Sequence, residues 1–450
     1  MIKKFLIFIF FLANSIFSAG NLDTSFNNTG FNITQEGIES EAMALVIQPD
    51  GKILAAGSAI MPNNTTIGII SRYKIDGSLD LAFGNNGKIL VRVPQYQNCG
   101  ITDIKIDSNS KIVASCIAFN THDSPHAFAA RFLPSGSLDS TFNNQGFSGL
   151  NEISAAHSLD IQTDGKILLA GEIYQDNTKR IAIFRFNNDG SYIDNLNIFP
   201  TAQQFANLES ICKKIIVQPN NKILIVGNIG QTHFMLTRLT PAGLMDNLFN
   251  SGATSINSGL NATRPATSMV LQPDGKIIVG GRYGNSLTLW RFNSDGTIDT
   301  SFSGGVNGGL IQVSSQTKKV VDLKLQTDGK IIAIGNVYPG PTKFQLIRLS
   351  TSGIKDYSFG TNGIVTVTIG TACRANALAI QNDGKIVICG QSNLLGQNHL
   401  MIARFNAQSA PQPMIISETE YAGEVGSGVL GKRPTEEEKE ETGIKKIKKE

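Results

Sequence analysis

Basic side chains recur at matching places along the chain, and their chemistry is suited to binding an anion. Four of them lie eleven or twelve residues before a lysine that follows a tight turn, and a neighbouring loop adds an arginine and a tyrosine. The set is Arg264, Arg282, Tyr283, Lys318, Lys319 and Arg374. Guanidinium forks bind carboxylates in two-point contacts, and an aromatic ring offers a flat platform. These residues predict a site for an anionic glycan or a carboxylated polymer.

The alternative is a solvated loop surface on which acidic residues balance these cations. The acidic candidates are Glu39, Glu152, Glu172 and Asp176.

The histidines and cysteines form no recognisable metal or catalytic pattern. His122 and His126 share a loop with Asp123, but a four-residue spacing brings side chains together on a helix, whereas this loop joins strands. The five cysteines show no metal-ligand spacing and are interpreted as small core residues, although a pair such as Cys99 with Cys116 stays open. We therefore assign no catalytic residue, metal or cofactor.

Seven copies of a turn motif divide the chain into repeats. The first copy is Pro49-Asp-Gly-Lys-Ile53, and its lysine returns every 54 to 59 residues, at 52, 111, 166, 222, 276, 330 and 385. An alternating apolar stretch precedes each copy and a β-branched stretch follows, which predicts two strands joined by a tight turn. A third strand ends in an arginine, a second turn of the type Asp76-Gly-Ser-Leu-Asp80 follows, and a fourth strand comes after it.

Four short strands in each of seven repeats predict an all-β, seven-bladed β-propeller. The seventh repeat stops after its third strand at Arg404-Phe405-Asn406, and the chain begins with a copy of the missing piece at 22–35. The N-terminal strand is therefore expected to complete the last blade. An open solenoid is the alternative. The repeated arginines and second-turn aspartates are interpreted as turn caps with partly buried side chains.

The repeated pattern, including Gln48-Pro-Asp-Gly-Lys-Ile53 and Phe83-Gly-Asn-Asn-Gly87, resembles the delta-60 repeat family of bacterial β-propellers. The resemblance covers residues 22–406. It implies export and a repeat scaffold, and it brings no activity with it.

The two ends differ from the repeats. Residues 1–20 have a basic start, an apolar run from Phe5 to Ala13 and small residues at 18–20, which predicts a signal peptide. An N-terminal membrane anchor is the alternative. The propeller is expected over 21–406, followed by a disordered or weakly helical charged tail over 407–450. Lys432-Arg433 and the basic cluster 445–449 also fit a two-part nuclear-import pattern.

The overall charge argues against nucleic acid as a partner. A formal net charge of +3 over 450 residues gives no whole-molecule attraction for nucleic acid. We expect an exported monomer, periplasmic, cell-surface or extracellular, that binds a protein or glycan through the rim carrying the irregular loops and has no enzymatic activity. The alternatives are a polysaccharide hydrolase or lyase and, third, a host-directed effector that uses the tail.

Overall fold

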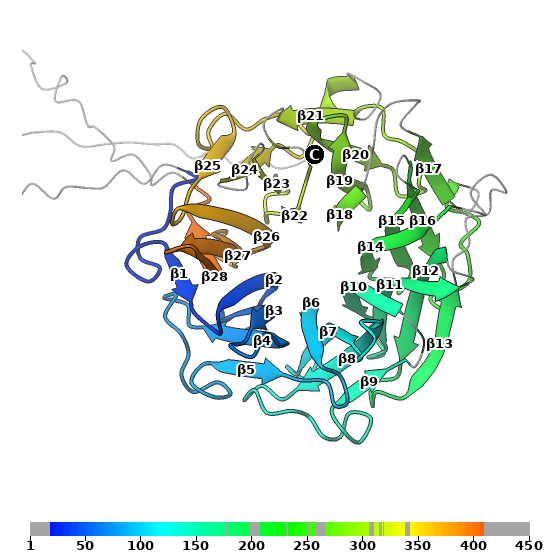
Figure 1. Cartoon of the computed structure of the whole chain (residues 1–450). Coiled ribbons are helices and arrows are strands. Elements are labelled where there is room, and N and C mark those ends of the chain that lie inside the picture. The colour runs from blue at the N-terminus through cyan, green and yellow to red at the C-terminus, as the bar shows by residue number, and fades with distance from the viewer. Residues whose placement is uncertain are drawn as a thin grey trace, which may run out of the picture. The chain divides into compact units, whose positions relative to one another are not determined.

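The chain forms a ring of seven four-stranded antiparallel sheets around a central channel, a seven-bladed β-propeller (Figure 1). The computed structural model describes residues 19–150, 152, 154–175, 178–197, 208–230, 233–250, 253–257, 266–305, 310–314, 317, 319–337 and 343–408. The apolar N-terminal run and the charged tail lie outside the described residues. Within the described part, no helix has the length and apolar character needed to cross a bilayer.

The blades follow one another in chain order. Blade 1 has β2 (Glu39–Ile47), β3 (Ile53–Ile60), β4 (Thr66–Tyr73) and β5 (Lys88–Val91). Blade 2 has β6 (Asn98–Ile106), β7 (Ile112–Phe119), β8 (Pro125–Phe132) and β9 (Phe147–Gly149). Blade 3 has β10 (Ser154–Ile161), β11 (Ile167–Gln175), β12 (Thr178–Phe186) and β13 (Tyr192–Asn197). Blade 4 has β14 (Ser210–Val217), β15 (Ile223–Ile229), β16 (His233–Leu239) and β17 (Ala253–Asn257).

Blade 5 has β18 (Ala266–Leu271), β19 (Ile277–Tyr283), β20 (Ser286–Phe292) and β21 (Leu310–Ser314), with a short 3-10 helix, η3 (Phe302–Gly305), before β21. Blade 6 has β22 (Asp322–Leu325), β23 (Ile331–Asn336), β24 (Phe344–Leu349) and β25 (Ile364–Val367). Blade 7 has β26 (Ala372–Ile380), β27 (Ile386–Leu394), β28 (Gln397–Phe405) and the N-terminal β1 (Phe31–Thr34). The first strand of each repeat is innermost.

The predicted closure by the N-terminal strand is confirmed. β1 pairs antiparallel with β28, with Phe31 opposite Ala403 and Thr34 opposite Leu400. Residues preceding β1 extend the contact, because Gly20 N donates to Asn406 O at 2.7 Å and Ala19 is buried. The two distant ends of the repeat region thus lie in one blade, and the ring has no open edge there.

The hydrophobic core lies between neighbouring blades. One cluster joins Leu54 and Ile70 of blade 1 to Ile104 and Ile112 of blade 2, all essentially inaccessible to solvent. Similar clusters lie at the other blade junctions. The five cysteines are free thiols, and all are buried, as their interpretation as core residues requires.

The repeated arginine and aspartate form a cluster that joins each blade to the next. In blade 4, Arg238 Nε donates to Asp246 Oδ2 at 2.7 Å, and Arg238 Nη1 donates to the carbonyl of Ser294 in blade 5 at 2.7 Å. The guanidinium lies 4.6 Å from the ring centroid of Phe249, and Lys222 contacts the same carboxylate at 2.9 Å. The aspartates also cap their turns, since Asp299 Oδ1 accepts from Ser301 N at 3.0 Å. The capping interpretation is correct, and ion pairing is added to it.

Candidate functional site

Six of the seven innermost strands contain an extra residue at the same place. The pairing register shifts between Ala42 and Ala44 in β2 and between Ala375 and Ala377 in β26, and equivalent shifts occur in β6, β10, β14 and β18. A β-bulge leaves one residue out of the ladder and re-aims its side chain. We call the bulged residues, together with Val321 at the matching place in blade 6, the bulge ring. Its members all line the channel: Met43, Thr102, His157, Lys213, Thr267, Val321 and Asn376.

The bulge ring surrounds a cavity of about 700 Å³ in the channel. Ring members differ from blade to blade, whereas the turn clusters are repeated almost unchanged. Identical residues in every blade serve the scaffold, so specific binding is expected where the copies differ. None of the residues that line this cavity is a phenylalanine, tyrosine or tryptophan. The bulge ring is therefore a polar site with a single large exposed apolar side chain, Met43.

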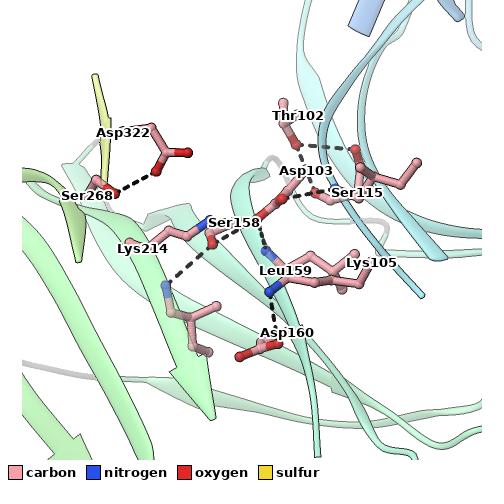
Figure 2. Close-up of polar contacts among 12 residues, drawn as sticks. Thr102, Asp103, Lys105, Ser115, Ser158, Leu159, Asp160, Lys214, Ser268 and Asp322 are labelled. Carbon is pink, nitrogen blue, oxygen red and sulfur yellow. Dashed lines mark hydrogen bonds and ion pairs between the residues drawn. The ribbon is translucent and has the colours of Figure 1, made fainter. Parts of the chain in front are cut away.

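Next to the bulge ring the inner strands carry six charged residues, which we call the charged belt: Asp103, Lys105, Asp160, Lys214, Asp322 and Lys324. Figure 2 labels all of them except Lys324. Asp103 Oδ2 accepts from Lys214 Nζ at 3.2 Å and from Leu159 N at 2.9 Å. Asp322 accepts from Lys324 Nζ at 2.9 Å and from Ser268 Oγ at 2.8 Å. Three carboxylates and three ammonium groups balance one another.

Asp103 and Lys214 of the belt are held in their charged forms. Burial by itself would raise the pKa of Asp103, but the Lys214 and Lys105 ammonium groups hold that pKa below its usual range. Burial likewise opposes the charge of Lys214, yet Asp103 and Asp322 raise the pKa of this lysine. Because the charges are paired, the belt offers no net attraction to an ion. A ligand that depends on charge must be held elsewhere along the channel.

Positive charge gathers at the end of the channel where the inner strands begin. Burial lowers the pKa of Lys319, and the positive charges of Lys213, Arg374 and Arg282 lower it further. In the described part of the chain, neither Lys319 nor Arg374 forms an ion pair with a carboxylate. The Nε atom of Arg374 is buried without a hydrogen-bond partner. We call Lys213, Arg282, Lys319 and Arg374 the cationic arc.

The structure brings three of the six predicted site residues into this arc. Lys319 and Arg374 line the cavity, and Arg282 is close enough for its charge to act on Lys319. Tyr283 instead packs against the apolar cluster between blades 4 and 5 and does not line the cavity. Arg264 and Lys318 lie outside the described residues.

Two carboxylates stand close to the arc, since the charge of Arg374 acts on Glu41 and the charge of Glu172 acts on Lys213. Burial raises the pKa of Glu41, against the opposing effects of Arg374 and Asn376. Glu172 of β11 is buried and contacts His157 Nε2 through Oε2 at 2.6 Å. This carboxylate holds the imidazole of a bulge-ring residue in one orientation, an arrangement that also suits a proton-transfer group.

Sequence reasoning missed the bulge ring, including Lys213 and His157. Attention fell on residues eleven or twelve positions before the turn lysine, whereas the ring lies nine positions before it. The sequence did mark the ring, because the residue nine positions before the turn lysine differs in type from repeat to repeat, whereas the residue before it is always small or apolar. The pairing register that makes this place special exists only in the folded sheet.

Five segments of the chain match the model of a domain of unknown function described as a β-propeller (DUF5122): residues 48–83, 162–191, 272–302, 326–359 and 381–411. The match supports a propeller repeat family. The repeats without a match are those of blades 2 and 4, whose first turns have Asn109-Ser110 and Asn220-Asn221 in place of Asp-Gly. No curated protein matches the chain.

Solved structures of similar shape are distant in sequence. A protein of unknown function from Dyadobacter fermentans is 11% identical, with a TM-score of 0.45, over 84% of this chain and 99% of that one. The polysaccharide lyase Uly1 is 9% identical, with a TM-score of 0.49, over 87% of this chain and 97% of that one. The NanB sialidase from Streptococcus pneumoniae is 12% identical, with a TM-score of 0.43, over 84% of this chain and 71% of that one.

Proposed function

We propose that the protein is an exported, non-enzymatic binding protein that holds an anionic ligand at the channel mouth, against the cationic arc. The observation that carries the proposal is the gathering of Lys319 and Arg374 on the cavity wall, where the buried Nε of Arg374 has no hydrogen-bond partner. Like charges held close together raise the free energy of the unliganded protein. A carboxylate or sulfate group placed between them would supply the missing partner and relieve their mutual repulsion.

Export is part of the proposal and rests on the N-terminal sequence, with its basic start, apolar run and small residues. An exported protein meets carboxylated and sulfated polymers and acidic protein surfaces outside the cytoplasm. The monomeric state stays a prediction, which size-exclusion chromatography with light scattering would test.

The test is binding of the full-length mature protein to labelled polyglutamate and polygalacturonate at rising salt concentration. We expect binding that weakens with salt, and a loss of about tenfold or more in affinity in the double variant Lys319→Gln, Arg374→Gln. Lys74→Gln is the matched control, because Lys74 is an exposed lysine in a turn at the opposite end of the blade. The double variant is expected to melt no lower than the parent, because removing the two cations relieves repulsion.

The proposal fails if neither polymer binds the parent protein, or if Lys74→Gln weakens binding as much as the double variant does. A loss of melting temperature in the double variant alone would point to a structural effect, and a circular dichroism scan separates the two cases.

A second candidate, a polysaccharide lyase or hydrolase, is favoured by the contact between His157 and Glu172 at the cavity wall. A histidine held by a carboxylate is a recognised general base. Release of reducing ends or of unsaturated sugars from polygalacturonate, lost in His157→Gln, would establish this activity. The host-directed effector depends on the tail, which lies outside the described residues.

A further inference from the structure

A second pocket opens off the channel between blades 1 and 2. Its volume is about 360 Å³, and it is bounded by residues of β2, β3, β4, β6 and β7. Met43 and Thr102 of the bulge ring line both this pocket and the channel cavity. A ligand held in the channel mouth can therefore extend into the pocket without crossing a wall of protein.

The pocket exists because one side chain is missing. Gly100 stands eleven residues before its turn lysine, the place that holds Glu41, Lys319 and Arg374 in blades 1, 6 and 7. A Cβ atom at Gly100 would meet only Ser58 Cβ, at 3.5 Å, an ordinary van der Waals distance. Gly100 is also absent from the residues with positive φ. Neither backbone conformation nor crowding demands a glycine, so its effect is to leave the space open.

The lining of this pocket is suited to an apolar group. Ile101, Ile117 and Phe119 contribute hydrocarbon surface, and Met43 keeps 40% of its surface exposed beside them. Methionine is flexible and adapts to differently shaped partners.

Two of the polar groups of the pocket are already satisfied within the protein. Asn98 Oδ1 accepts from Thr66 N at 2.8 Å, and Thr102 Oγ1 donates to Ala156 O at 2.8 Å. These two groups have little to offer a polar ligand. Glu41 also lines the pocket, and its carboxylate would repel a carboxylate of the ligand, so burial of hydrocarbon is the main gain there.

The pocket is joined to the cationic arc by direct contacts. Asn376 Nδ2 donates to Ala42 O at 2.9 Å and contacts Met43 Sδ at 3.5 Å. Asn376 follows Arg374 by two residues on β26. The path along the channel wall therefore runs from the Arg374 guanidinium, past Asn376 and Met43, into the pocket between blades 1 and 2.

We infer that the ligand is an acidic peptide segment of a partner protein, with a carboxylate against Lys319 and Arg374 and a neighbouring apolar side chain in the pocket between blades 1 and 2. This inference rests on the proposed function and narrows it. A peptide offers both groups close together along one chain. An acidic glycan lacks a hydrocarbon side chain, and the channel cavity has no aromatic residue on which a sugar ring would stack.

The experiment compares two labelled hexapeptides by fluorescence anisotropy, one alternating glutamate with leucine and one alternating glutamate with glycine. The full-length mature protein is expected to bind the leucine peptide about tenfold more tightly, because a buried leucine side chain gains that much. Gly100→Leu fills the pocket and should abolish the preference while leaving binding of the glycine peptide intact. Gly100→Ala, which adds a single methyl group, should reduce the preference in part.

Three further outcomes are decisive. A preference for leucine that survives in Gly100→Leu, with an unchanged melting curve, overturns the inference. Polygalacturonate that binds as tightly as the leucine peptide and is indifferent to Gly100→Leu also overturns it, while the proposed function stands. Failure of every anionic probe to bind removes the proposed function itself. If Gly100→Leu melts early, Ser58→Leu fills the same pocket from blade 1 and repeats the test.

Discussion

The arginine at the end of each third strand combines an ion pair, a hydrogen bond to the next blade and a contact with an aromatic ring. Blade 3 departs from this arrangement. Arg185 pairs with Asp194, but the side chain of Asp194 is 38% exposed. This repeat also has no phenylalanine at the position that stacks on the arginine in the other repeats. Lys166 also contacts Asp164 of its own turn and makes no contact with Asp194. The repeated arginine is therefore expected to contribute less to the free energy of unfolding in blade 3 than in the other blades.

Replacing the arginine should reveal this difference. Arg238→Ala leaves the buried Asp246 with one cation and removes the bond to Ser294, so we expect a loss of about 3 kcal/mol in the free energy of unfolding. Arg185→Ala breaks a more exposed pair and should cost about 1 kcal/mol. Urea denaturation of both variants checks the prediction, and equal losses would show that the turn cluster does not depend on burial.

The residues of the channel site were harder to predict from the sequence than the residues of the repeated turns. Arginines and lysines near the channel mouth could be picked out, because their distance from the turn lysine is fixed by the strand between them. His157 and Lys213 could not, since the bulge that turns them toward the channel is a property of strand pairing. Tyr283, which the sequence suggested as part of a loop, lies at the end of β19 and packs against the core.

At the scale of elements, the N-terminal strand that closes the ring is held by side-chain ion pairs as well as by backbone hydrogen bonds to β28. Asp23, just before β1, accepts from Arg404 Nε at 2.8 Å and contacts Lys385 Nζ at 3.0 Å. Burial opposes the charge of Asp23, but hydrogen bonds from Ser25 and Lys385 and the charge of Arg404 lower its pKa from the usual 3.8 to about 2. The carboxylate therefore favours the closed ring only while it is ionised.

Acid should accordingly loosen the closure. A group with a lowered pKa in the folded state stabilises the protein above its unfolded pKa, and this contribution is lost as pH falls through the folded pKa. We expect the melting temperature to drop between about pH 4 and pH 2, the interval set by the shift of Asp23. Asp23→Asn should melt lower at neutral pH and lose less on acidification, measured by differential scanning calorimetry. A parallel fall in both proteins would contradict the assignment.

The strands themselves were readable because each blade repeats its turn chemistry. Gly51 and Gly275 have positive φ at the first turn, and Ser110 and Asn221 adopt the same left-handed conformation where the glycine is replaced. The turn keeps its geometry in those two blades at some cost in strain, which is greater for serine than for asparagine. The blade count followed from counting these turns, and the N-terminal closure followed from the copy of the missing fourth strand at 22–35.

At the scale of the whole molecule, the charged belt connects blades that are not neighbours. Asp103 belongs to blade 2 and Lys214 to blade 4, and the charge of Asp322 in blade 6 also acts on Lys214. No sequence pattern marks such contacts, since they join residues 111 positions apart that meet only when the ring is closed. The belt thus depends on the completed propeller, and we expect the channel to depend in turn on the belt's charges being balanced.

A double-mutant cycle on the belt tests this dependence. Lys214→Met leaves Asp103 and Asp322 facing each other across the channel without the cation between them, and we expect a loss of about 3 kcal/mol in the free energy of unfolding. Asp103→Asn in the same chain removes one of the opposed carboxylates, so the double variant should recover part of that loss. Urea titrations of the parent, the two single variants and the double variant give the coupling energy. Additive losses would mean that Lys214 and Asp103 act separately, and the channel wall would then be held by the strand ladders alone.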